Sequence, residues 1–448
     1  MIDGLFFVVK ITHREDTMHV LFTFVCFFLV GCFESSTQVE EPSTNEDTSE
    51  RVPQHQIFLP CETIPLVEKV LLVPPGPDRV RTVPEDLRSV IKEGSRLMHE
   101  ARLEKDRCGG SGLGWRKCLG DFLIAAVDAN GQIVTFGLYE EEMSNHGFTV
   151  KCEREGGCGA GVNPSFHVKS PPGWTVVAIR TAVKPKEGTE EDADGAVYIP
   201  YSSRLNTPEL RLEGMTYLQE LALGAYHELH ARRVKSDFLS DVLVTDIGTP
   251  DHIVALILTE QMFSDRKFEQ GTDAERLAML NRALTIIGAN RDRAYWFTRS
   301  PVGASGPAQI MAGTYRRLRD RYPQAYLMED VDLGRLEHHN AFKAALLHAD
   351  AELWPMPEEY QQRLWHHPEE ARIVLAAGYN ASSKTVYEAI VACGDAWRET
   401  SCEQTKDQKK GRLPVETRRY LIKYEWIYSV LFDPVFRQQV YENVNHPR

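Results

Sequence analysis

The 448-residue sequence contains no apolar run of roughly 20 residues, the length that a helix needs to span a bilayer permanently. Positive charge is also scarce, because 64 Asp and Glu outnumber 51 Lys and Arg and leave a net charge of −13. This charge argues against nucleic acid as a partner and against docking of the protein surface on anionic lipid. The hydrophobic and charged fractions, 42% and 26%, are ordinary for a globular protein, and the length suggests two or three domains.

The N-terminus is expected to be a targeting segment. Val20–Val30 is apolar and its end forms Leu29-Val30-Gly31-Cys32, which resembles the lipobox of bacterial lipoproteins. The resemblance implies a signal peptide over residues 1–32, a lipid anchor on Cys32 and, because Phe33 is not Asp, an outer-membrane lipoprotein facing the periplasm. The alternatives are a cleaved secretory signal with an incidental Cys, and translation from Met18.

A tether and a mostly β domain are expected next. Residues 33–56 are rich in Glu, Ser, Thr and Pro and are expected to be disordered. In residues 57–205, two alternating runs within Asp121–Leu138 flank Asn130-Gly131 and predict a hairpin. Trp174–Val183 and Ala196–Ile199 predict further strands. We expect an accessory domain here, with envelope proteins as candidate partners.

Local disulfides are the default for the cysteine spacing of an exported chain. The expected pairs leave Cys61 unpaired and are Cys108 with Cys118, Cys152 with Cys158, and Cys393 with Cys402. A zinc site is the weaker alternative, because it would need closer pairs and His partners. We expect no metal and no cofactor.

Helical periodicity takes over from about residue 206. A connecting helix is expected within 206–236, and 237–448 is expected to be all-α, which makes the fold class α+β. Thr272 and Glu275 form a capping box at the start of a helix expected to stop at Gly288. Further helices are expected at Ala308–Tyr322, Asn340–Leu353, Pro368–Ala377, Ser383–Val391 and Val415–Leu431. Their short connections predict a compact domain with a groove.

One of these helices carries an acid on its apolar face. Thr249 and Pro250 are suited to cap and start a helix over Thr249–Phe263. Helical spacing then places Glu260 on the stripe formed by Ile253, Leu256 and Ile257. Poor solvation would raise the pKa of this carboxyl toward the range of a general acid. The alternative is a structural carboxylate held by Arg266 or Arg291.

Three later segments change the balance between these alternatives. They read SPVGASGPAQIMAGT at 300–314, LAAGYNASS at 375–383 and LPVETRRYL at 413–421. A Glu at the end of an apolar helix, followed in order by a GAxGxxQ(I/M)M segment, a YNA segment and a P-x-E-T-x-x-Y segment, resembles the lysozyme-like domain of soluble lytic transglycosylases. The four motifs extend over roughly 170 residues.

The resemblance implies roles for particular residues. Glu260 would be the catalytic acid, and Gly303, Gly306, Gln309 and Met311 would line the glycan groove, with Pro307 starting the helix that presents Gln309. Tyr379 and Asn380 match the Tyr-Asn motif beside the acid, and Glu416 and Tyr420 match the motif on the far wall. An outward-facing Gln309 and a Glu416 that serves only as a first-turn helix acid are the alternatives for those two residues.

The sequence departs from the family pattern in two places. Ser382 replaces a Gly after the Tyr-Asn pair, and the segment 265–299 is inserted between Glu260 and the glycine-rich turn. Tyr295 and Trp296 in this insertion are candidates to stack on a sugar, although core packing is commoner for aromatic residues. Glu269 and Glu275 are rival acids, but neither lies on an apolar stripe.

A single well-placed acid is compatible with lytic transglycosylation. Glu260 would protonate the glycosidic oxygen between N-acetylmuramic acid and N-acetylglucosamine, and would then accept the proton of the muramoyl 6-hydroxyl as a 1,6-anhydro ring closes. A hydrolase would need two carboxylates. The alternatives are a goose-type muramidase and a non-catalytic murein-binding lipoprotein. In each case the expected partner is the peptidoglycan glycan strand.

Overall fold

The computed structural model describes residues 87–101, 122–138, 144–145, 147–153, 165–181, 196–262, 265–399, 402 and 413–445. The chain divides into the units Met1–Cys61 and Glu62–Arg448, and every described residue belongs to the second unit. The predicted signal peptide with Cys32, the tether, and the side chains of Cys108, Cys118, Cys152 and Cys158 lie outside the described residues.

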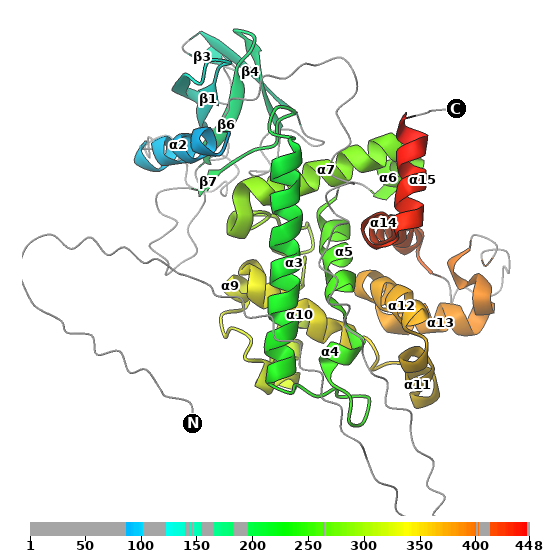
Figure 1. Ribbon diagram of the computed structural model, residues 1–448. Helices are drawn as coiled ribbons and strands as arrows, with labels where there is room; N and C mark the ends of the chain where they lie inside the picture. Colours follow the sequence, from blue (N-terminus) through cyan, green and yellow to red (C-terminus); the bar gives the residue numbers. More distant parts are fainter. Residues whose placement is uncertain are drawn as a thin grey trace, which may run out of the picture. The chain divides into compact units, whose positions relative to one another are not determined.

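Helices and antiparallel strands occur together, so the fold class is α+β (Figure 1). The strands are β1 (Phe122–Val127), β2 (Ile133–Leu138), β3 (Ser144–Asn145), β4 (Phe148–Glu153), β5 (Ser165–Ser170), β6 (Thr175–Thr181) and β7 (Ala196–Tyr198). One sheet has the order β2-β1-β6-β7 and the other has the order β3-β4-β5.

The predicted hairpin is confirmed. β1 pairs antiparallel with β2, and Val127 lies opposite Ile133. Gly131 has φ +82°, a backbone conformation that glycine adopts without steric cost. The Asp128 carboxylate stabilises the turn by accepting from the backbone N–H groups of Asn130 and Gln132, each at 2.8 Å.

Helix α2 (Leu87–Glu100) lies in the region that the sequence predicts as mostly β. Its buried residues Ile91 and Met98 share a core cluster with strand residues of β1 and β6. A Cβ atom at Gly94 would lie 2.9 Å from the Val177 side chain, so glycine permits the close approach of helix and sheet.

The remainder of the described chain is helical. The helices are α3 (Pro208–Ala231), α4 (Val244–Ile247), α5 (Pro250–Gln261), α6 (Asp265–Gln270), α7 (Asp273–Asn290), α8 (Ala312–Arg321), α9 (Val331–Leu336), α10 (His338–Ala351), α11 (Glu358–His366), α12 (Pro368–Ala381), α13 (Ser383–Cys393), α14 (Val415–Phe432) and α15 (Pro434–Asn445). Cys393 and Cys402 form a disulfide with a Cα–Cα distance of 5.8 Å. Within the described residues, no helix combines the length and the apolar character needed to cross a membrane.

Helix α5 is buried on all sides. Every residue from His252 to Thr259 is buried, whereas the sequence predicted only a stripe. The helix packs against both α3 and α14 (Figure 1). Because it has no solvated face over these two turns, its last turn is held firmly in place.

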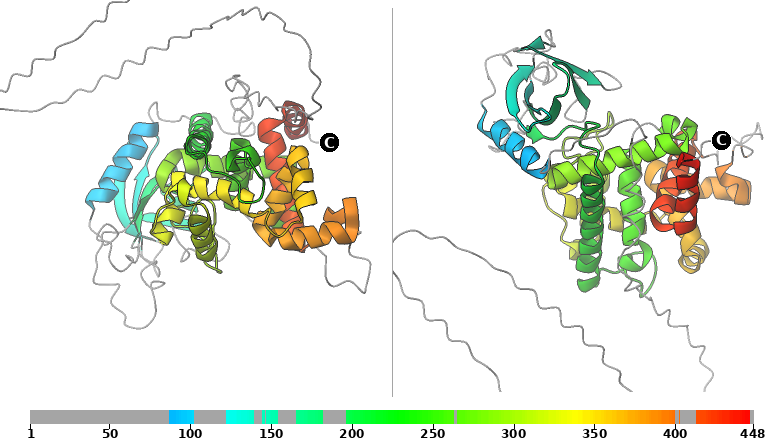
Figure 2. Two further views of the ribbon diagram at one scale, coloured as in Figure 1. Left: turned by 90° about the horizontal axis from the view of Figure 1, so that it is seen from below. Right: turned by 45° about the horizontal axis from the view of Figure 1, so that its top comes forward.

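The prediction that α7 stops at Gly288 is wrong, because the helix continues to Asn290. Helix α7 crosses α3 (Figure 2). Gly288 instead lies at the close approach of the two helices, because a Cβ there would be 1.9 Å from the backbone oxygen of Leu210. Gly214 on α3 is the matching residue, with a Cβ position 2.1 Å from the backbone oxygen of Leu284. Two facing glycines therefore let the two backbones touch.

We predict that Gly288→Ala destabilises the protein, because the added methyl group would force α3 and α7 apart. The expected loss is about 1–3 kcal/mol of unfolding free energy, the usual cost of overpacking, measured by chemical denaturation. Gly224→Ala on α3 is the control, since its Cβ would lie 3.4 Å from the movable His339 side chain. The control is expected to match or slightly exceed wild-type stability; equal losses in both variants would contradict the close crossing.

Candidate active site

Glu260 lies in the last turn of α5. Thr249 caps this helix by accepting from the His252 N–H at 3.2 Å, and Pro250 occupies its first position, as the sequence predicts. The buried turns then carry Glu260 to the edge of the core, where it keeps partial exposure between the buried Thr259 and Gln261. The carboxyl group is therefore largely removed from solvent but remains partly accessible.

The shielding raises the pKa of Glu260 and so makes it a weaker acid. Burial raises its pKa from 4.5 to about 7, although a hydrogen bond from Tyr420 and the charge of Lys423 act in the opposite direction. Tyr420 donates to Oε1 of Glu260 at 2.8 Å. Lys423 is paired with Asp265 at 2.5 Å, and the charge of Asp265 acts against that of Lys423 by raising the pKa of Glu260. A carboxyl group that titrates near neutral pH can both give and accept a proton.

The sequence left open that Glu260 is a structural carboxylate held by Arg266 or Arg291, but its hydrogen-bond partner is a different residue. The hydrogen bond comes from Tyr420, a neutral donor on α14, and not from Arg266 or Arg291. Arg291 pairs with Glu213 at 3.1 Å. Within the last turn of α5, the acid is therefore not neutralised by an ion pair with either arginine.

The glycine-rich turn is fastened to α5. The side chain of Gln261, the neighbour of Glu260, donates to the backbone oxygens of Gly306 at 3.1 Å and Pro307 at 2.7 Å. Gly303 and Gly306 have φ +93° and +76°, and a Cβ at Gly306 would lie 2.0 Å from the backbone oxygen of Arg335. Glycine is therefore required at Gly306 for close packing.

The expectation that Pro307 starts a helix presenting Gln309 is wrong. Helix α8 begins at Ala312, and Gln309 lies in the turn with φ +48°. Its side-chain nitrogen donates to the backbone oxygen of Gly306 at 2.8 Å. Gln309 is half-buried and holds the turn together, whereas Met311 is 41% exposed.

Tyr379 connects this turn to the acid. It lies in the last turn of α12, and its hydroxyl donates to the backbone oxygen of Ala308 at 2.5 Å. Burial and, next in size, the charge of Glu260 raise its pKa well above the ordinary value, so the hydroxyl stays neutral beside the acid. Tyr420 is therefore hydrogen-bonded to Glu260, and Tyr379 is close enough for the charge of Glu260 to act on it.

The other two motif residues, Asn380 and Glu416, make no hydrogen bond to Glu260 in the described part of the chain. Asn380 is exposed, and its side-chain oxygen accepts from the Thr417 hydroxyl at 2.8 Å. Glu416 is exposed in the first turn of α14, the position of a helix-start acid. Tyr420, one turn further along α14, is the residue that contacts Glu260.

The sequence reasoning missed a second polar pair beside Tyr379. Nε2 of His348 lies 3.0 Å from Oε1 of Glu352, and the His348 ring meets Tyr379 edge-on at a centroid distance of 4.7 Å. Burial raises the pKa of Glu352, but hydrogen bonds from His348 and Ser383 outweigh it and lower the pKa. The spacing of four residues between His348 in α10 and Glu352, the residue that follows this helix, was the signal available in the sequence.

Gly378 makes room for this pair. A Cβ at Gly378 would lie 2.7 Å from Oε2 of Glu352. The glycine that precedes the Tyr-Asn motif in this chain is therefore explained by the carboxylate that it faces.

An open cleft adjoins the pair. It has a volume of about 370 Å³, and its lining includes His348, Glu352 and Trp354 together with Arg317 and Arg321 of α8. Glu260 does not line it directly, but the charge of His348 acts on Glu260. The volume is within the range of small-molecule sites.

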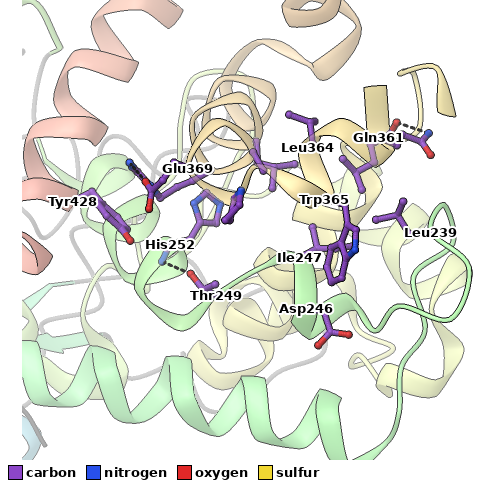
Figure 3. A pocket seen from close by; sticks show the side chains of 15 residues that line it. Leu239, Asp246, Ile247, Thr249, His252, Gln361, Leu364, Trp365, Glu369 and Tyr428 are labelled. Atoms are coloured by element: carbon purple, nitrogen blue, oxygen red, sulfur yellow. Dashed lines mark hydrogen bonds and ion pairs between the residues drawn. The ribbon is translucent and has the colours of Figure 1, made fainter. Parts of the chain in front are cut away.

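A second, smaller cavity of about 150 Å³ lies at the opposite end of α5 (Figure 3). It is lined by His252, Trp365 and Tyr428 among others. Burial lowers the pKa of His252 to about 3, so this imidazole is neutral. Eight residues of helix, about 12 Å, separate His252 from Glu260, which keeps this cavity apart from the acid.

The rival acids and the inserted aromatics have structural roles. Glu269 pairs with Arg419 at 2.7 Å, and Glu275 accepts from the Thr272 N–H, the contact that most lowers its pKa. Tyr295 is a core residue with 5% exposure, so of its two candidate roles the structure shows core packing and not stacking on a sugar. Trp296 is half-buried with the Arg293 guanidinium 4.8 Å from its ring centre.

In the described ranges, no group of three or more His, Cys, Asp or Glu side chains is arranged to hold a metal ion.

Comparison with known proteins returns no relative: no family model matches the chain, and no curated protein and no solved structure is significantly similar to it. The chemistry of the site must therefore be argued from its geometry. A proton donor of near-neutral pKa, two neutral tyrosines and an ionised Glu352 beside an open cleft are suited to acid–base cleavage of a polar substrate.

We predict that Glu260 makes stability depend on pH. Its folded-state pKa of about 7 lies above the ordinary 4.5, so its contribution is complete below pH 4.5 and is lost as the pH rises through 7. Between pH 5 and pH 8.5, wild type should lose roughly 2 kcal/mol of unfolding free energy relative to Glu260→Gln, after allowance for the partial exposure. The control is Glu269→Gln, and parallel curves for wild type and Glu260→Gln would disprove the shift.

Proposed function

We propose that this protein is a lytic transglycosylase that cleaves the β-1,4 bond between N-acetylmuramic acid and N-acetylglucosamine in peptidoglycan. The observation that carries the proposal is the environment of Glu260: a partly buried carboxyl with a pKa of about 7, bonded to Tyr420 and adjoining Tyr379. The proposal includes a lysozyme-like fold for the helical part of the chain. It also includes an outer-membrane lipid anchor on Cys32.

The geometry supports a mechanism with one carboxyl group. Protonated Glu260 donates to the glycosidic oxygen, and the bond from that oxygen to the muramoyl anomeric carbon breaks. Glu260, now ionised, takes the proton of the muramoyl 6-hydroxyl, whose oxygen bonds to the anomeric carbon and closes the 1,6-anhydro ring. The proton returns to Glu260, so no water is consumed.

Tyr420 is the residue that suits both halves of this cycle. Its hydroxyl donates to Oε1 of Glu260 and stabilises the anion that forms after the first transfer. Burial works against that anion and keeps the acid protonated at the start. The balance of these two effects holds the pKa near neutral.

One observation favours a second candidate, a muramidase. Glu352 is ionised, lies in the cleft and is held by His348 and Ser383. A second carboxylate near the acid is what hydrolysis by water requires. The two reactions leave different ends, because hydrolysis gives a reducing muramoyl end and transglycosylation gives an anhydro ring.

We predict that Glu260→Gln retains the fold and loses at least 10²–10⁴-fold of the turnover on purified sacculi, the usual contribution of a general acid. Mass spectrometry of the soluble products measures both the rate and the chemistry. Anhydro-muropeptides from wild type support the proposal, and reducing ends support the muramidase. Sacculus binding without any soluble product would make the protein a murein-binding lipoprotein, and full activity of Glu260→Gln would exclude Glu260 as the acid.

We also predict that Tyr420→Phe moves the pH dependence of cleavage. Loss of the hydroxyl removes the hydrogen bond that lowers the pKa of Glu260, so the alkaline limb of the pH–rate profile should move to higher pH while kcat falls. Tyr424→Phe is the matched control on α14, because its hydroxyl contacts His252 at 2.6 Å and not the acid. An unmoved alkaline limb in Tyr420→Phe would show that another group sets it.

A further inference from the structure

Trp354 is an exposed aromatic residue that lines the cleft. It lies three residues beyond the end of α10 and keeps 60% of its surface exposed, although an indole ring has a large apolar area to bury. It lines the same cleft as His348 and Glu352. A large apolar face is thus available to whatever occupies this cleft.

The ring is held rigidly. The guanidinium group of Arg321 lies 4.4 Å from the centre of the Trp354 ring, and Phe238 lies beside it at 6.5 Å, with an angle of 21° between the rings. Arg321 is fixed in turn by an ion pair with Asp237 at 3.2 Å. Because the ring is already ordered, a ligand that stacks on it loses little side-chain entropy.

His348 connects this cleft with the surroundings of the acid. His348 lies six residues before Trp354, lines the same cleft, and packs edge-on against Tyr379. The charges of both Glu260 and Glu352 act on Tyr379. Trp354 is therefore related to Glu260 through the cleft that it shares with His348, the ring contact of His348 with Tyr379, and the charge of Glu260 that acts on Tyr379.

We propose that Trp354 is a distal saccharide subsite, on which a pyranose ring of a long glycan strand stacks while another part of the strand is cleaved at Glu260. The inference rests on the proposed function for its substrate class. The C–H face of a pyranose is apolar and matches the indole, whereas its rim of hydroxyl and N-acetyl groups matches polar cleft residues such as Arg317 and Asp320. The subsite would make the protein prefer long strands to single disaccharide units.

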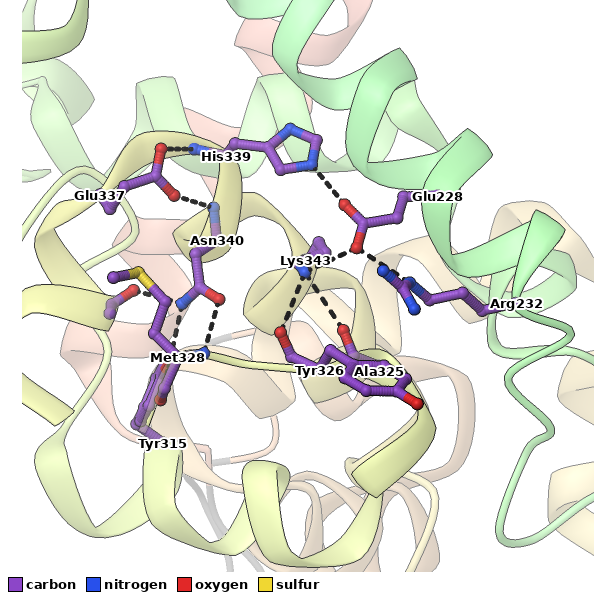
Figure 4. Close-up of polar contacts among 11 residues, drawn as sticks. Glu228, Arg232, Tyr315, Ala325, Tyr326, Met328, Glu337, His339, Asn340 and Lys343 are labelled. Atoms are coloured by element: carbon purple, nitrogen blue, oxygen red, sulfur yellow. Dashed lines mark hydrogen bonds and ion pairs between the residues drawn. The ribbon is translucent and has the colours of Figure 1, made fainter. Parts of the chain in front are cut away.

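A second exposed aromatic residue provides a matched control. Tyr326 is 68% exposed and has the Arg232 guanidinium 4.4 Å from its ring centre (Figure 4). It does not line the cleft. Lys343 donates to the backbone oxygen of Tyr326 at 3.3 Å and to Glu228 at 2.9 Å. Because those contacts do not involve the Tyr326 ring, Tyr326→Ala removes an arginine-stacked aromatic and keeps the polar cluster.

The test measures binding and cleavage separately. Binding to purified sacculi is measured with Glu260→Gln protein, so that the result does not depend on turnover. Adding Trp354→Ala should weaken this binding about tenfold, whereas Tyr326→Ala should leave it unchanged. With Glu260 restored, Trp354→Ala should raise KM for long strands with little change in kcat, and should not affect short fragments.

The outcomes distinguish this inference from the proposed function. Equal sacculus binding by the Trp354→Ala and Tyr326→Ala proteins would overturn the subsite, even if wild type releases anhydro-muropeptides. Weaker binding by the Trp354→Ala protein alone would support the subsite, even if wild type releases no product. Trp354→Phe should restore part of the binding, which would show that the loss is due to the missing ring and not to misfolding.

Discussion

The hydrogen bond between Tyr420 and Glu260 depends on most of the helical architecture. It requires the last turn of α5 to lie beside the second turn of α14, and both helices are buried along most of their length. The next residue, Gln261, ties the same turn of α5 to the glycine-rich segment, and Tyr379 ties that segment to α12. Helix α14, the glycine-rich segment and α12 lie far apart in the sequence. These hydrogen bonds join all three to the last turn of α5, α12 through the glycine-rich segment.

Burial and hydrogen bonding act in opposite directions on the two acids near Tyr379. At Glu260 the loss of solvation prevails, because one neutral hydroxyl donates to it and the nearby Lys423 is occupied by Asp265. At Glu352 the donors prevail, because His348, the Ser383 N–H and the Ser383 hydroxyl all bond to it. Two carboxyl groups of the same chemistry are therefore set to different protonation states by the number of their donors.

The sequence predicted local features well and long-range contacts poorly. The cap at Thr249, the capping box at Thr272 and the hairpin at Asn130-Gly131 depend on neighbours within a few residues, and each is present. The boundary at Gly288 was wrong because a glycine that ends a helix and a glycine at a helix crossing look alike until the second helix is known. Gln309 was misplaced for the same reason, since the contacts that fix its turn come from Gln261 and Arg335. The Glu352 pair needed α10, α12 and α13 to be brought together.

The buried Arg335 side chain shapes the glycine-rich segment without using that segment's own side chains, apart from a contact with Ser305. Its guanidinium donates to the backbone oxygens of Gly303 and Ile310, at 2.9 and 3.1 Å, and it is itself anchored to Asp332. A loop whose path is set through its carbonyl groups tolerates replacement of its outward residues, such as Val302, which is 75% exposed. Such a loop can diversify during evolution and acquire new ligand preferences while the acid behind it stays unchanged.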